Sequence, residues 1–233
     1  MADVRESLAR LNPATIRLDI GRGGVPDLTN QDVAAALAFV PAGLGREVLI
    51  ACWWPGGADP RKLMDAVLTE VDVEWRRQSV LLSNARTDVG MAEAIAGWNR
   101  NSSIGQRQDV DRAKAKWEAI RDKCWPKDTG AMLPALVGAC LEEIAGRQQC
   151  PDCEGRGEKL RGELRVPCAR CNHTGDVQAS NAARARAIGR DEASFRRNWA
   201  GVYTWILDLL TEAEQSAARA LRDALSGGDQ ART

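Results

Sequence analysis

The sequence predicts a mainly α protein: a helical body with an inserted four-cysteine β-ribbon and a C-terminal helix-turn-helix-like element. Three observations predict this class. Apolar residues recur at helical spacing through much of residues 30–149. Two Cys-x-x-Cys pairs interrupt that pattern within residues 150–177. Residues 178–226 then return to alanine-rich, helix-forming sequence.

The composition is that of a globular chain without an obvious charge-driven partner. Its 233 residues are 44% hydrophobic, enough for a buried core in one or two domains, and the formal net charge is zero. Seven cysteines, an odd number, and no visible signal peptide favour reduced thiols in a cytosolic setting. No apolar run is long enough to cross a bilayer, so we expect no membrane partner.

The N-terminal half is expected to be helical after a flexible arm over residues 1–29. Thr29 or Asn30 is a candidate N-cap for a helix from Gln31 or Asp32. A second helix is predicted over residues 44–53, and Pro60 begins a third. The apolar face of this third helix has a four-residue step: Leu63, Val67, Val71 and Trp75.

Residues 79–127 are predicted to form further helix, broken near residues 99–105. This charged, tryptophan-bearing stretch is typical of a helix that docks along one edge and is solvated on the other, and a partner-binding surface is the alternative. Residues 130–146 are strongly apolar and lead directly into the first cysteine pair.

The two cysteine pairs predict a closed metal site. Each Cys-x-x-Cys turn brings two thiolates together, and two turns complete a tetrahedral zinc site with four sulfur ligands: Cys150, Cys153, Cys168 and Cys171. Since no coordination position stays open for water or substrate, we expect one structural Zn²⁺. Residues 159–166 alternate in character and predict a two-stranded ribbon between the pairs. His173, the only histidine, is interpreted as a loop residue and not as a ligand.

Helix-turn-helix geometry is predicted after the ribbon. Ser180 is a candidate N-cap, and Ala185 and Gly189 stand four residues apart, as the tight turn requires. A core between the two helices would be filled by Ile188, Phe195 and Trp199. A helical hairpin packed on the body is the alternative. Thr211 is expected to cap a separate last helix, followed by a polar tail over residues 227–233.

Basic residues outnumber acidic ones between residues 147 and 200, which suits contact with DNA phosphates. The candidate DNA-contacting residues are Arg184, Arg186, Arg190, Ser194, Arg196 and Arg197. Among these, Arg196 and Arg197 are the best candidates for base contacts, because arginine can bind a guanine edge through two hydrogen bonds. A single histidine, and the lack of a Walker A loop or dinucleotide fingerprint, argue against an enzyme.

The combination of motifs resembles a known family. The sequence reads CPDCEGRG and CARCNHTG around the cysteines, then SNAARARAIG and SFRRNWAGVYTWILDLL, with DVAAALAFVPAGLGREVLIACWW near its start. These stretches resemble the late-gene antitermination proteins of lambdoid phages, the Q proteins of the lambda type. The resemblance covers most of residues 30–225 and is weakest over residues 79–127. His173 stands where a glycine is expected.

The resemblance implies a transcription antitermination factor. Such a protein binds double-stranded DNA within a phage late promoter, engages bacterial RNA polymerase paused with its primary sigma factor, and makes it read through pauses and terminators. A second copy on the DNA is a further candidate partner. The main alternative is a zinc-containing DNA-binding repressor that never engages polymerase. Weaker alternatives are a cysteine-rich module of the J-domain co-chaperone type, suggested by CPDCEGRG, and a thiol redox enzyme.

Overall fold

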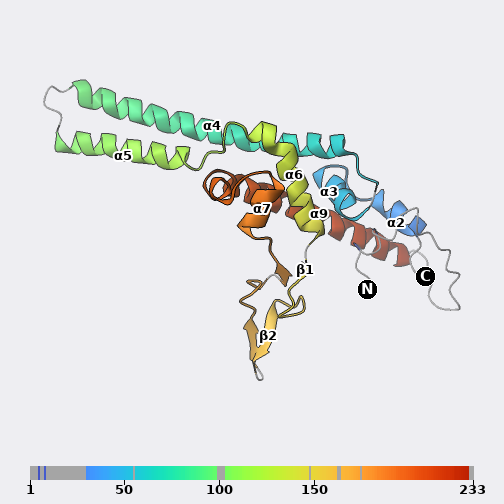
Figure 1. The fold of residues 1–233 in the computed structure, drawn as a ribbon. Helices are drawn as coiled ribbons and strands as arrows, with labels where there is room; N and C mark the ends of the chain where they lie inside the picture. Colours follow the sequence, from blue (N-terminus) through green and yellow to red (C-terminus); the bar gives the residue numbers. More distant parts are fainter. Residues whose placement is uncertain are drawn as a thin grey trace, which may run out of the picture. The chain divides into compact units, whose positions relative to one another are not determined.

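The structure is a computed structural model that describes Arg5, Leu8 and residues 30–54, 56–98, 103–146, 148–161, 164–173 and 175–230. These residues are mainly helical, as predicted, with short antiparallel strand pairs (Figure 1). The rest of the predicted N-terminal arm lies outside the described residues. The chain divides into two compact units, one formed by Met1–Met64 and Gly130–Thr233 and the other by Asp65–Thr129.

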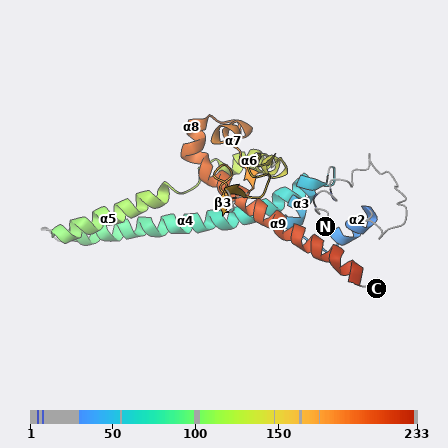
Figure 2. The ribbon, with the colours of Figure 1, turned by 90° about the horizontal axis from the view of Figure 1, so that it is seen from below.

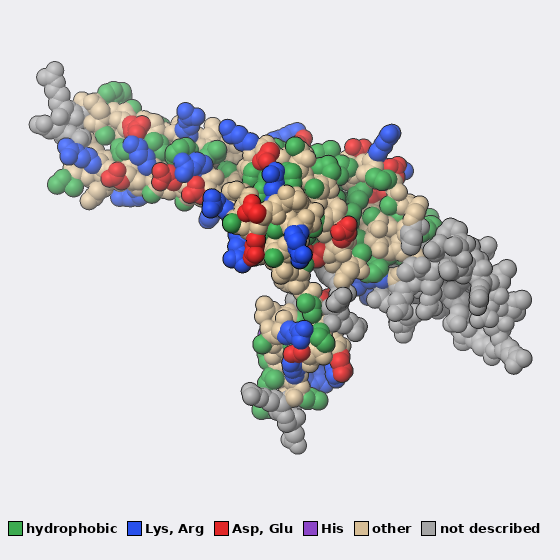
Figure 3. Space-filling view, viewed as in Figure 1, with side chains coloured by type: hydrophobic (Ala, Val, Ile, Leu, Met, Phe, Trp, Pro, Cys, Tyr) green, Lys and Arg blue, Asp and Glu red, His purple; other side chains and the backbone are tan. Residues whose placement is uncertain are grey.

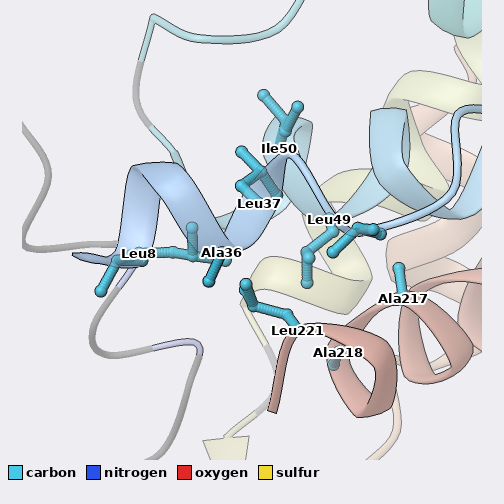
Figure 4. Packing of buried hydrophobic residues seen from close by; sticks show 10 residues of the cluster. Leu8, Ala36, Leu37, Leu49, Ile50, Ala217, Ala218 and Leu221 are labelled. Carbon is cyan, nitrogen blue, oxygen red and sulfur yellow. The ribbon is translucent and has the colours of Figure 1, made fainter. Parts of the chain in front are cut away.

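The core of the first unit is built where helix α9 (Ala200–Gln230) packs beside α2 (Asn30–Leu37) and α3 (Leu44–Trp53) (Figure 2). The α3 bounds are those predicted from the sequence. Figure 4 shows the buried apolar residues that meet there: Leu8, Ala36, Leu37, Leu49, Ile50, Ala217, Ala218 and Leu221. Gly45 permits the close approach of α3 to α9, because a Cβ at this position would lie 2.6 Å from the Ala213 carbonyl oxygen.

A buried carboxylate, that of Glu214, joins three segments of this core through hydrogen bonds. Glu214 on α9 accepts hydrogen bonds from Trp53 Nε1 at 3.0 Å and from two Arg5 nitrogens at 2.8 and 2.9 Å. The predicted helix start at Thr211 is wrong, because α9 continues without a break from Ala200 to Gln230. No proline or glycine interrupts the chain there, and Glu214 takes partners from other segments instead of completing a cap. The predicted tail is helical as far as residue 230.

The remaining elements of this unit lead to and from the cysteine ribbon. Helix α6 (Thr129–Ala145) buries its apolar side, including Leu136 and Cys140. Strands β1 (Gln148–Gln149), β2 (Glu158–Arg161), β3 (Leu164–Pro167) and β4 (Asp176–Val177) follow, with β1 paired to β4 and β2 to β3. Then come α7 (Asn181–Ala187), α8 (Glu192–Ser194) and a π-helical turn, η2 (Phe195–Trp199), before α9.

The second unit is a helical hairpin formed by most of α4 (Pro60–Trp98) and by α5 (Ile104–Arg121). The predicted break near residues 99–105 is therefore confirmed. Ser103 and Gln106 form a reciprocal capping box that starts α5. Two ion pairs of 2.8 Å, Lys114–Glu93 and Lys116–Asp88, join the helices. Within the described residues, no helix is apolar over a length that would let it cross a membrane.

Candidate metal centre and the helix pair that follows it

The four predicted ligands come together in one buried cluster. Their sulfur atoms all lie within 4.8 Å of one another, with Cys150 Sγ 3.8 Å from Cys168 Sγ and Cys153 Sγ 3.6 Å from Cys171 Sγ. A disulfide bond would bring two sulfurs to about 2.05 Å, so none of the four cysteines is in a disulfide bond. The cluster has the geometry of a site for one metal ion.

The two cysteine turns are related by an approximate twofold repeat, with matching positions 18 residues apart. The Cys150 amide donates to the Gly175 carbonyl at 2.7 Å, and the Cys168 amide donates to the Gly157 carbonyl at 2.9 Å. Each of these glycines also donates its own amide, at 3.3 Å, to the second sulfur of its turn. Each half of the repeat therefore fixes the other half and supplies an N–H group that stabilises a thiolate.

Both turns depend on left-handed backbone conformations. Gly157 and Gly175 have φ of 73° and 82°, and a Cβ on either would lie 2.3 Å from a carbonyl oxygen of the opposite turn. His173, at φ 70°, occupies the position equivalent to Gly155, at φ 79°. Histidine is among the non-glycine residues that tolerate this region, which explains how it replaces the expected glycine. His173 is exposed and lies outside the sulfur cluster.

Electrostatic contacts reinforce the centre. Asp152 in the first turn accepts hydrogen bonds from Lys159 at 2.6 Å and from Arg170 in the second turn at 2.9 Å. These two hydrogen bonds, the one from Lys159 first, lower the pKa of the Asp152 carboxyl. Burial alone would raise the pKa of the Cys168 thiol. Hydrogen bonds from the backbone N–H groups of Cys171 and Arg170 outweigh burial and lower this pKa. Sequence reasoning missed these two ion pairs, since their charged residues are seven and 18 residues apart.

After the ribbon come the short helix α7, a turn, and then α8, η2 and α9 in direct succession. The Ser180 side chain accepts a hydrogen bond from the Ala183 amide at 3.2 Å and caps α7. Ala185 is buried, and Gly189 has a left-handed φ of 66°. Three apolar side chains predicted to fill the space between the helices are buried: Ile188, Phe195 and Trp199. The Phe195 ring also meets Tyr203 edge to face, with centroids 5.5 Å apart.

Most of the candidate DNA-contacting residues lie at the surface. Arg186, Arg190, Arg196 and Arg197 are exposed, and Ser194 is half-buried. Arg196 pairs with Glu192 one turn before it, and the Arg190 guanidinium lies 5.4 Å from the Trp199 ring centroid. The π-helical turn also exposes Asn198, which sequence reasoning missed because a regular helix was assumed there.

Arg184, also a candidate DNA-contacting residue, is mostly buried in the structure. Its guanidinium donates two hydrogen bonds to the Glu143 carboxylate, at 2.9 and 2.5 Å, and the two side chains are only 13% and 11% exposed. It also lies 5.2 Å from the Tyr203 ring centroid. Because its donors face Glu143, Arg184 links α7 to α6 and is not positioned to contact DNA.

Comparisons with known protein families, with curated proteins and with solved structures find no match to this chain.

Proposed function

We propose that this chain is a DNA-binding transcription antitermination factor that carries one structural zinc ion. The observation that carries the proposal is the direct succession of a closed four-cysteine centre and a helix pair that exposes Arg196, Arg197 and Asn198. With a metal ion bound, the cysteine centre would hold the ribbon in one conformation. The exposed side chains supply hydrogen-bond donors for nucleic acid.

The cysteine geometry favours zinc as the metal. A tetrahedral zinc site with Zn–S bonds of about 2.3 Å has sulfur–sulfur edges of about 3.8 Å. The two short edges here, 3.8 and 3.6 Å, match that value. Four thiolates leave no open position, so the ion would supply rigidity and no reaction chemistry. Lys159 and Arg170, held at Asp152, would offset the negative charge of the tetrathiolate.

The helix pair supports a helix-turn-helix role. Ala185 is small and buried, Gly189 has the left-handed φ that a tight turn requires, and the buried Phe195 and Trp199 would fill the core between the two helices. The N-terminal part of the second helix is then left to contact base edges, with Arg suited to guanine and Asn to adenine. Arg186 and Arg190 would contact the phosphate backbone and set the register.

The step from DNA binding to antitermination rests on the resemblance to the lambda-type Q proteins. On that basis the protein would act in the cytoplasm of a bacterial host, bind late-promoter DNA and load onto RNA polymerase held near the promoter with its primary sigma factor. The polymerase supplies the chemistry, and this chain supplies contacts only. No catalytic residue is assigned.

A two-stage experiment tests this function. Full-length protein would first select its site from a random-sequence duplex library, and binding would then be measured by mobility shift. Arg196→Ala and Arg197→Ala should each weaken specific binding about 5- to 150-fold. Arg112→Ala, which removes another exposed, ion-paired arginine, on α5, should not weaken it. Unchanged binding by both test variants would exclude this helix as the reading element.

The second stage places the selected site ahead of an intrinsic terminator in a run-off transcription assay with bacterial RNA polymerase. An antiterminator should raise the fraction of transcripts that pass the terminator. A repressor would lower the number of transcripts started without changing that fraction, and this result would favour the alternative function.

A further inference from the structure

The α4–α5 hairpin exposes an apolar stripe along α4. We define the stripe by Val73, Val80, Met91 and Trp98. The first three are between 57% and 61% exposed, and Trp98 is 87% exposed. Their spacing places all four within about 20° of one another around an ideal helix, over a length of about 38 Å. Figure 3 shows hydrophobic side chains at the surface of this hairpin among charged ones.

The spacing of the four stripe residues is the same in both directions along the helix. Its members are separated by seven, eleven and seven residues, so an antiparallel copy of the helix meets it in register. Val73 of one chain then faces Trp98 of the other, and Val80 faces Met91. An isologous twofold contact requires this self-complementarity, in which residue i meets j and j meets i. A heterologous partner would not require it.

The charges near the stripe are compatible with such a pairing. The twofold axis would pass between Asn84 and Thr87, which are exposed and uncharged, so no like charges meet at the centre. Arg76 and Arg77 lie on the two sides of the stripe, each about 40° from it. Arg76 pairs with Asp72 at 3.6 Å, and the Arg77 guanidinium donates two hydrogen bonds of 2.6 Å to Glu74, so each positive charge has an acidic partner.

We propose that this stripe is a surface through which two copies of the chain associate in antiparallel orientation. A contact about 38 Å long and about 10 Å wide covers about 400 Å² per chain, or about 800 Å² in total. This is the size of a weak, transient interface, so we expect a dissociation constant on the order of 100 µM for the free protein. The inference does not depend on the proposed DNA-binding function.

Sedimentation equilibrium of the full chain tests the association. Wild-type protein should show a reversible monomer–dimer equilibrium. Val80→Lys and Met91→Glu should each raise the dissociation constant at least about tenfold, because each places a charge in the apolar contact. Leu68→Lys is the matched control, since Leu68 is also an exposed apolar residue of α4 but lies about 140° from the stripe. It should leave the equilibrium unchanged.

A mixing experiment tests the antiparallel register. In a heterodimer of Val80→Lys with Met91→Glu chains, the new lysine faces the new glutamate, and the second Val80–Met91 contact is kept. Dimerisation should therefore recover in this mixture. It should not recover when Val80→Lys is mixed with Val73→Glu, because residue 80 does not face residue 73. Circular dichroism of each variant checks that the surface substitution leaves the helices intact.

Three results would overturn the inference. The first is a wild-type chain that stays monomeric at about 0.3 mM, well above the expected dissociation constant. The second is a Leu68→Lys variant whose dimerisation is as weak as that of the stripe variants, and the third is a mixture of Val80→Lys with Met91→Glu that stays monomeric.

Discussion

Glu143 anchors the contact between α6 and α7, and its removal should be among the most damaging single changes outside the cysteine cluster. Its carboxylate accepts two hydrogen bonds from Arg184 and one of 2.9 Å from the Tyr203 hydroxyl. Burial is the largest influence on the pKa of Tyr203 and raises it, so the hydroxyl remains a donor at neutral pH. In Glu143→Ala the Arg184 cation stays in a pocket that leaves it 13% exposed, without its counter-ion.

The expected cost follows from the burial of both partners. Removing one partner of a buried ion pair typically costs about 3–5 kcal/mol, because the remaining charge is neither solvated nor paired. In a chain of this size that corresponds to a fall in Tm of about 6–20 °C. Replacing both partners, in Glu143→Leu with Arg184→Met, should recover most of the loss, because the charge is gone and Tyr203 keeps the Ala139 carbonyl as an acceptor at 3.3 Å.

Urea unfolding followed by circular dichroism, with metal retained, measures both variants. If Glu143→Ala costs less than about 1 kcal/mol, or if the double variant is as unstable as the single one, the buried ion-pair reasoning is refuted. The double variant also separates structure from DNA contact. Because Arg184 is assigned a packing role, the folded double variant should bind DNA as the wild type does.

Three further predictions concern the cores and the cysteine turns. Burial raises the pKa of Cys140 from 9.0 to about 12, so the folded state keeps a proton that the unfolded state loses. Stability should therefore fall by about 1.4 kcal/mol per pH unit between about pH 9 and 12, and Cys140→Ala should remove this part of the slope in urea titrations at several pH values. Gly157→Ala should lower metal affinity at least about tenfold in a chelator competition, since its Cβ would lie 2.3 Å from the His173 carbonyl oxygen, whereas Gly90→Ala, in open space on α4, should not change it. Leu221→Ala should cost about 2–5 kcal/mol in urea unfolding, because the side chain is fully buried between α9 and its neighbours, and a cost below about 1 kcal/mol would contradict the packing described.

Local patterns predicted much of the fold. The bounds of α3, the start of α4 at Pro60 and the break before Ile104 follow from apolar periodicity and from proline and serine caps. The sulfur cluster follows from Cys-x-x-Cys spacing, because the two residues between the cysteines fix the turn. The helix bounds and each cysteine turn depend on residues within one or two turns of each other, and the metal-ligand chemistry of cysteine predicts that the two turns meet.

Features formed by distant residues could not be predicted in this way. Glu143 and Arg184 are 41 residues apart, so Arg184 was interpreted as a surface cation. The partners of Glu214, Trp53 and Arg5, lie 161 and 209 residues away from it, so the local sequence predicts a helix start at Thr211 that the structure does not have. The π-helical turn that exposes Asn198 likewise has no local sequence signature.

Native mass spectrometry of the full chain, with parallel titration of its thiols, tests the central claim most directly. One zinc ion should be bound per chain, with the thiols of Cys150, Cys153, Cys168 and Cys171 unreactive until the metal is removed. Cys168→Ser should lose the ion and unfold the ribbon, since structural zinc contributes on the order of 10 kcal/mol in small modules. A wild-type chain that is metal-free yet fully folded, with all four thiols free to react, would contradict the account.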